Sequence, residues 1–140
     1  MTADADRRTQ LLRGSLDTCL LALLDHTPTH AYDLVVQLER HGLPDISYGT
    51  VYPLMTRLRR QGLVSEQPEP SASGPPRKVF HLTAQGRSAL ATWVQQWSST
   101  TATITYLLTA AGALPTAPTT PAPLLPSALP APKVHNRVDA

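Results

Sequence analysis

The placement of proline limits how much of this chain can fold. Seven of the fourteen prolines lie in residues 113–140, the sequence ALPTAPTTPAPLLPSALPAPKVHNRVDA, which has no aromatic residue. Proline lacks a backbone N–H and has a fixed φ, so this segment can neither sustain a helix nor pair as a central strand. We therefore expect a Pro/Ala-rich disordered tail over residues 113–140. The remainder of the 140 residues is enough for one ordinary domain.

Four segments ahead of the tail have apolar residues at the spacing that predicts amphipathic helices. The expected ranges are Leu16 to about Asp25, Ala31 to Arg40, Gly49 or Thr50 to Gly62, and Ala84 to about Ala111. Pro53 favours the late start of the third helix, because a start at Ser47 would place the proline ring well inside it. Residues 1–10 are expected to form a flexible N-terminus. The expected buried side of the second helix consists of Tyr32, Val35, Val36 and Leu38.

A β-hairpin is predicted between the third and fourth helices. Its strand-like pieces, Leu63 to Gln67 and Lys78 to Leu82, flank a loop rich in Pro, Ser and Gly. Three helices, a hairpin and a long helix follow one another in a winged helix-turn-helix with a C-terminal dimerisation helix. The expected fold is thus mainly α with a small β-hairpin wing: a DNA-binding domain over residues 11–83 and a dimerisation helix over 84–112. A module that binds only proteins can have the same order of elements.

The third helix has two chemically different faces. The apolar stripe, which would pack on the core, consists of Val51, Met55 and Leu58. The second face, which has no acidic residue, consists of Tyr48, Tyr52, Thr56 and Arg59. The first turn adds small or hydroxylated residues with free N–H donors, which suit a phosphate oxygen: Ser47, Gly49 and Thr50. These groups are the candidate contacts to nucleic acid.

Positive charge is concentrated in the middle of the chain, although the net charge is only +2. No acidic residue occurs between Glu69 and Asp139, and a stretch of 31 residues holds Arg57, Arg59, Arg60, Arg77, Lys78 and Arg87. A local positive field favours a polyanionic partner. The arginines at 57–60 have a second explanation, because the helix dipole stabilises cations at a helix C-terminus. Charge alone leaves both interpretations open.

Four segments make the chain similar to a known family. LLRGSLDTCLLALL, THAYDL, SYGTVYPLMTRLRRQGLV and RKVFHLTAQGRSAL occur in the order and at the spacing seen in the PadR family of bacterial transcriptional repressors, which the chain resembles over about residues 11–97. The resemblance implies a winged-helix homodimer joined mainly by its first and last helices. It also implies that the third helix enters the major groove of an inverted-repeat operator, with the wing at the flanking DNA. By position, the implied DNA contacts are Tyr48, Thr50, Tyr52, Arg77 and Lys78.

The chain departs from the family pattern at specific places. Ala31 stands where the family commonly has the glycine of a His-Gly-Tyr motif, and Arg59 stands where a glutamate is usual. The arginine should make the operator contact more electrostatic. After Trp97 the fourth helix is rich in threonine, and the resemblance cannot be followed through it.

The fourth helix carries an apolar seam and has no charged residue after Arg87. The seam has heptad spacing and consists of Leu90, Val94, Trp97, Thr101, Ile104 and Leu108. We expect it to form a dimer interface, widened by Trp93. The resemblance further implies release from DNA by a small, often aromatic effector, and the indoles of Trp93 and Trp97 suit a flat ligand. The alternative is that both tryptophans are ordinary interface core.

Other functions have little support in the sequence. The histidines at 26, 30, 41, 81 and 135 lack paired ligand spacing, and no Gly-rich phosphate loop or G-x-S-x-G elbow occurs. We therefore expect no enzyme activity, metal or cofactor. Cys19 is the only cysteine, which excludes an intramolecular disulfide.

We expect a cytoplasmic protein without a membrane partner. The N-terminus lacks the apolar region of a signal peptide, and LDTCLLALL is too short to span a bilayer. The predicted function is a sequence-specific DNA-binding regulator, a repressor that binds its operator as a homodimer. The alternative is a winged-helix module that binds proteins and no DNA.

Overall fold

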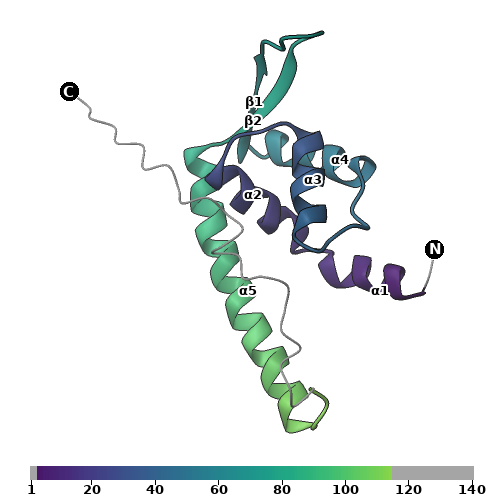
Figure 1. The fold of residues 1–140 in the computed structure, drawn as a ribbon. Helices are drawn as coiled ribbons and strands as arrows, with labels where there is room; N and C mark the ends of the chain where they lie inside the picture. Colours follow the sequence, from purple (N-terminus) through teal and green to yellow (C-terminus); the bar gives the residue numbers. More distant parts are fainter. Residues whose placement is uncertain (1–2, 115–140) are drawn as a thin grey trace.

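The computed structural model describes residues 3–114, and Figure 1 shows its elements in order. The helices are α1 (Ala3–Leu12), α2 (Leu16–His26), α3 (Ala31–Arg40), α4 (Tyr48–Arg60) and α5 (Ala84–Ala110), and the strands β1 (Val64–Glu69) and β2 (Arg77–Leu82) lie between α4 and α5. This arrangement confirms the predicted fold class, a helical domain with a two-stranded wing and a long last helix. The predicted tail lies almost wholly outside the described residues.

Helix α1 corrects the expectation for the N-terminus. Residues 1–10 were expected to be flexible, but Ala3–Leu12 form a helix. It buries none of its residues, and Leu11 is 75% exposed. With so many charged and polar side chains in residues 3–10, no apolar periodicity marks this helix in the sequence.

The core lies where α2, α3 and α4 meet the base of the wing (Figure 1). Its fully buried side chains include Leu20, Leu24, Leu34, Met55 and Phe80. As predicted, α4 contributes Val51, Met55 and Leu58.

The buried stripe of α3 differs from the predicted one. It runs through Ala31, Leu34 and Leu38. Tyr32 was expected to be buried but is 65% exposed, because it lies one residue, about 100°, away from that stripe.

Helix α4 begins earlier than predicted. The carbonyl oxygen of Ser47 accepts hydrogen bonds from Thr50 N at 3.0 Å and Val51 N at 3.1 Å, so the helix starts at Tyr48 and encloses Pro53. A proline at this position cannot donate to the carbonyl oxygen of Gly49. Because Gly49 is exposed, water can reach that oxygen.

The wing is an antiparallel hairpin held at its base by the segment before α3. Its register runs from the pair Val64 and Leu82 to the pair Glu69 and Arg77. Thr29 forms an isolated bridge to Phe80, with Phe80 N donating to Thr29 O at 2.8 Å and Thr29 N donating to Phe80 O at 3.3 Å. These bonds fix the start of α3 against β2.

Helix α5 leaves the wing and projects well beyond the rest of the domain (Figure 1). Thr83 caps it: its Oγ1 accepts from Gly86 N at 2.9 Å and donates to Gly62 O at 2.7 Å. The cap therefore ties α5 to the end of α4. No helix in residues 3–114 is both long and apolar enough to cross a bilayer.

Candidate nucleic-acid interface

A groove opens where the first turns of α3 and α4 face the second strand of the wing. Its volume is about 700 Å³. The lining residues are His30, Ala31, Tyr32, Tyr48, Tyr52, Pro76, Arg77, Lys78 and Phe80. Four of them, Tyr48, Tyr52, Arg77 and Lys78, are predicted DNA contacts. Folding thus gathers aromatic hydroxyls and cations from separate parts of the chain on one face.

The two tyrosines of α4 stack on each other in this groove. Their ring centroids lie 5.4 Å apart with an interplanar angle of 22°. They are four residues apart, so the helix places them one above the other. Tyr48 is 48% exposed, whereas Tyr52 packs against the core. Tyr48 is therefore free to contact a ligand, and Tyr52 supports it from below.

Five residues that line the groove are not among the predicted contacts: His30, Ala31, Tyr32, Pro76 and Phe80. His30 precedes α3 and caps it, because its Nδ1 accepts from Asp33 N at 3.2 Å. Histidine is not among the preferred capping residues, so its role has no strong signal in the sequence. Its second ring nitrogen, Nε2, lies 3.4 Å from Arg77 Nη1 on the wing.

The remaining predicted contacts of α4 lie outside the groove. Ser47 and Thr50 are exposed at the start of the helix, with their hydroxyl oxygens 3.4 Å apart. Thr50 borders a different hollow, together with Pro53 and Arg57. Thr56 is half-buried and donates its hydroxyl proton to Tyr52 O at 3.1 Å.

Arg59 is paired within the chain. Its Nη1 donates to Glu66 Oε1 at 3.2 Å, and Lys78 Nζ lies 3.6 Å from the same oxygen. Glu66 is on β1 and its side chain is only 12% exposed. One carboxylate therefore neutralises two of the predicted DNA-binding cations, one on α4 and one on the wing.

The sequence pattern of the transcriptional regulator PadR-like family matches residues 20–92 of the chain, which include the whole groove. The chain belongs to the PadR-like family. The resemblance noted from the four sequence segments is thereby confirmed.

Solved structures of PadR-like proteins have the same fold. A PadR-like transcriptional regulator from Bacillus cereus is 32% identical, with a TM-score of 0.65, over 71% of this chain and 96% of that one. A PadR family transcriptional regulator from Eggerthella lenta is 35% identical, with a TM-score of 0.67, over 74% of this chain and 89% of that one. Bacillus subtilis PadR in complex with operator DNA is 20% identical, with a TM-score of 0.53, over 58% of this chain and 47% of that one.

Membership in the PadR-like family identifies the protein as a transcriptional regulator. Members of the family are regulators and not enzymes. The match to solved structures of PadR-like regulators, over 71% and 74% of this chain, confirms the predicted winged-helix fold.

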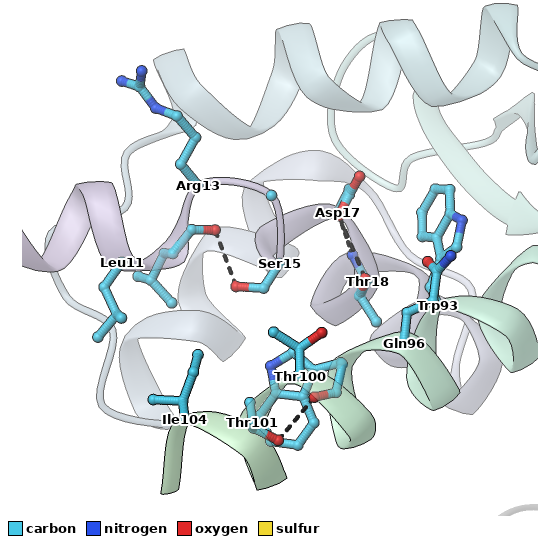
Figure 2. A pocket seen from close by; sticks show the side chains of 13 residues that line it. Leu11, Arg13, Ser15, Asp17, Thr18, Trp93, Gln96, Thr100, Thr101 and Ile104 are labelled. Atoms are coloured by element: carbon cyan, nitrogen blue, oxygen red, sulfur yellow. Dashed lines mark hydrogen bonds between the residues drawn. The ribbon is translucent and has the colours of Figure 1, made fainter. Parts of the chain in front are cut away.

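This PadR-like regulator has a second, larger open space between the α1–α2 corner and α5. Its volume is about 720 Å³, and Trp93, Trp97 and Ile104 line it, as Figure 2 shows in part. Opposite them lie side chains of the corner, among them Leu11 and Ser15. Both tryptophans predicted for an effector or a dimer interface thus border one space.

Three residues of the predicted seam do not line this space: Leu90, Val94 and Leu108. Leu90 is 9% exposed and belongs to the core of its own chain, so it cannot form part of an exposed seam. The reason is its position near the start of α5, where the helix packs on α2. Val94 is 47% exposed but lies outside the lining of the space.

Proposed function

We propose that this regulator is a sequence-specific DNA-binding repressor that binds an inverted-repeat operator as a homodimer. The observation that carries the proposal is the groove, in which the tyrosines of α4 and the cations of the wing share one face. Helix α4 provides the element that enters the major groove, and the wing provides cations beside it. The operator complex of Bacillus subtilis PadR, which has this fold, supports the assignment.

Phosphate contacts supply the affinity in this proposal. Arg77, Lys78 and the N-terminal turn of α4 meet backbone phosphates, and Tyr48 and Thr50 add hydroxyl donors. If a dimer neutralises six to eight phosphates, its affinity falls on the order of a thousand-fold between about 50 and about 200 mM salt. Arg59 and Lys78 contribute fully only after they leave Glu66.

A homodimer is supported by the outer half of α5. Beyond Leu90, the apolar side chains that face solvent in the single chain include Val94, Trp97, Ile104 and Leu108, which are 41–55% exposed. A helix with such a surface favours a partner helix. A two-fold axis there would present two α4 helices, and binding to the half-sites of an inverted repeat requires them to lie about one DNA turn apart.

A small apolar or aromatic effector is the proposed signal for release. The space bordered by Trp93 and Trp97 has the size of a ligand site and aromatic walls. A flat ligand added to the protein should quench tryptophan fluorescence and lower DNA affinity together. If neither changes with any compound of a diverse aromatic set, the tryptophans are interface core.

The experiment that tests the proposal begins with selection of binding sites from a random duplex library. Fluorescence anisotropy then measures the affinity for the selected site and for random DNA at low and high salt. Tight binding of a palindromic site with a steep salt slope supports the proposal. Repression of a reporter gene that carries this site would show that the protein acts as a repressor and not as an activator. No binding even at low salt would favour the alternative, a winged-helix module that binds proteins.

A further inference from the structure

His30 and Arg77 lie face to face although they are 47 positions apart in sequence. His30 Nε2 and Arg77 Nη1 are separated by 3.4 Å. The Thr29–Phe80 bridge holds their elements together, since it pairs the backbone beside His30 with β2. The two side chains are thus positioned by the fold and need little reordering to act together.

The position of the proton on the His30 ring determines whether its contact with Arg77 can be a hydrogen bond. Its Nδ1 accepts a hydrogen bond from Asp33 N, so in the neutral ring the proton is on Nε2. Arginine has only donors. Two donors therefore face each other, and the contact is no hydrogen bond between them. An acceptor from outside the chain, placed between them, would satisfy both.

The surroundings of the pair favour an anion. Arg77 is exposed and forms no ion pair within residues 3–114, unlike Lys78 beside it. Asp33, the carboxylate nearest His30 in sequence, accepts from Thr29 Oγ1 at 2.9 Å and from Gln37 Nε2 at 2.6 Å. The pair borders two open hollows, the groove and a smaller one under the wing tip. Glu69 lines the smaller one, so an anion would approach the pair from the groove, whose lining has no acidic residue.

We propose that His30 and Arg77 together bind one backbone phosphate of the operator, each donating to a non-bridging oxygen. The inference rests on the proposed DNA-binding function and adds His30 as a contact that spans the helix-turn-helix and the wing. Arginine supplies the charge, and the imidazole N–H supplies a directed hydrogen bond. Because the fold sets their spacing, the phosphate also fixes the register of the protein on DNA.

The substitution H30N separates this role from capping. Asparagine is a preferred N-cap and keeps an acceptor for Asp33 N, but it lacks the Nε2 donor. We expect an unchanged melting temperature and an affinity for the selected site that falls about three- to tenfold. The control is H41N, the same change at the other end of α3 and outside the groove, which should leave affinity unchanged.

The partner residue is tested by R77Q and by the double variant. R77Q should weaken binding and lower the salt slope by about one, whereas H30N should leave the slope nearly unchanged. The double variant should lose less than the product of the two single losses, because both act on one phosphate. Independent losses that multiply would place the two residues on different phosphates and overturn the shared site.

A methylphosphonate scan locates the ligand. Neutral methylphosphonates replace single phosphates of the selected duplex, and each contacted position should weaken the wild-type protein. At the shared phosphate, H30N should lose less affinity than wild type because only Arg77 still contacts it, and the double variant should be nearly unaffected. If H30N binds every duplex as tightly as wild type, the inference fails and the proposed function stands. If the wild-type protein binds no duplex at low salt, the proposed function itself fails. If circular dichroism shows H30N to be less stable, H30S, which also caps helices, repeats the comparison.

Discussion

Arg59 Nη1 donates to Glu66 Oε1 across 3.2 Å, which joins the last turn of α4 to the first strand of the wing. Lys78 Nζ approaches the same carboxylate oxygen to 3.6 Å. Both cations are about half-exposed or more, so the pairs contribute less than about 1 kcal/mol to stability. Their larger effect in the proposed complex is on charge, because the carboxylate would compete with DNA phosphates for both cations.

Replacing Glu66 by glutamine should therefore strengthen binding to DNA of any sequence. E66Q releases Arg59 and Lys78, so the salt slope should become steeper by about one to two. Selectivity should fall, because phosphate contacts carry no sequence information. Anisotropy titrations of the selected site and of random DNA at several salt concentrations measure both effects.

The matched control for this prediction is E69Q on the same strand. Glu69 forms no ion pair among the described residues, so its removal frees no cation. Each variant removes one negative charge. If that loss alone strengthens DNA binding, the gain in affinity should appear in both variants. Equal slopes for E66Q and E69Q would contradict the proposed competition.

Substitution of Tyr48 tests whether α4 contacts DNA at this residue. It is 48% exposed and its ring stacks on Tyr52, so Y48A should lower the free energy of unfolding by about 1 kcal/mol or less. Its loss from the groove should weaken binding of the selected site about tenfold. Chemical denaturation and anisotropy of the same preparation provide the two measurements, and unaltered affinity would remove Tyr48 from the interface.

Tyr52 needs a milder change because it packs against the core. Y52A should destabilise the domain by about 2 kcal/mol, so weaker binding by that variant would be ambiguous. Y52F keeps the ring and removes only the hydroxyl. A loss of affinity in Y52F with an unchanged melting temperature would assign the hydroxyl a role at DNA.

Local patterns explain which features the sequence could predict. Helix Ala31–Arg40 has the predicted bounds, and the stripe of Val51, Met55 and Leu58 is buried as expected. Both depend on helical periodicity, which neighbouring residues determine. The predicted and observed stripes of α3 share Leu38 but begin at different residues: the predicted stripe begins at Tyr32, whereas the buried one begins at the smaller Ala31.

Features that depend on distant contacts were not predictable. His30 reaches the groove only because Thr29 pairs with Phe80, and no periodicity links those two segments. The pairing of Arg59 with Glu66 likewise requires the wing to fold back beside α4. Sequence patterns predict the tyrosines and wing cations that line the groove, while tertiary structure determines which of these cations form ion pairs.

Trp97 tests the proposed dimer. It is 55% exposed in the single chain, so W97E should leave the domain folded. A carboxylate buried in a helix–helix interface would weaken the dimer by at least about a hundredfold in Kd. Sedimentation velocity over a concentration series measures the dissociation. Q95E adds the same charge two residues away, on the opposite side of α5, and should stay dimeric; an unaffected W97E dimer would move the interface elsewhere.

Gly86 tests how α5 is joined to the wing. A Cβ at this position would collide with the carbonyl oxygen of Leu63 and with the Leu82 side chain. The backbone oxygen cannot move without disturbing the base of β1, so G86A should lower the free energy of unfolding by about 2 kcal/mol or more. Urea denaturation followed by circular dichroism gives this value.

Gly49 provides the control for that substitution, since a Cβ there would meet only Ser47 Oγ at 3.6 Å. It lies in a helix with ordinary φ, so G49A should gain about 0.5 to 1 kcal/mol from helix propensity. The same substitution, glycine to alanine, should therefore lower the free energy of unfolding at Gly86 and raise it at Gly49. If both variants were equally stable, the close approach of α5 to Leu63 would not constrain the fold, and Thr83 would remain as the contact that sets the direction of α5.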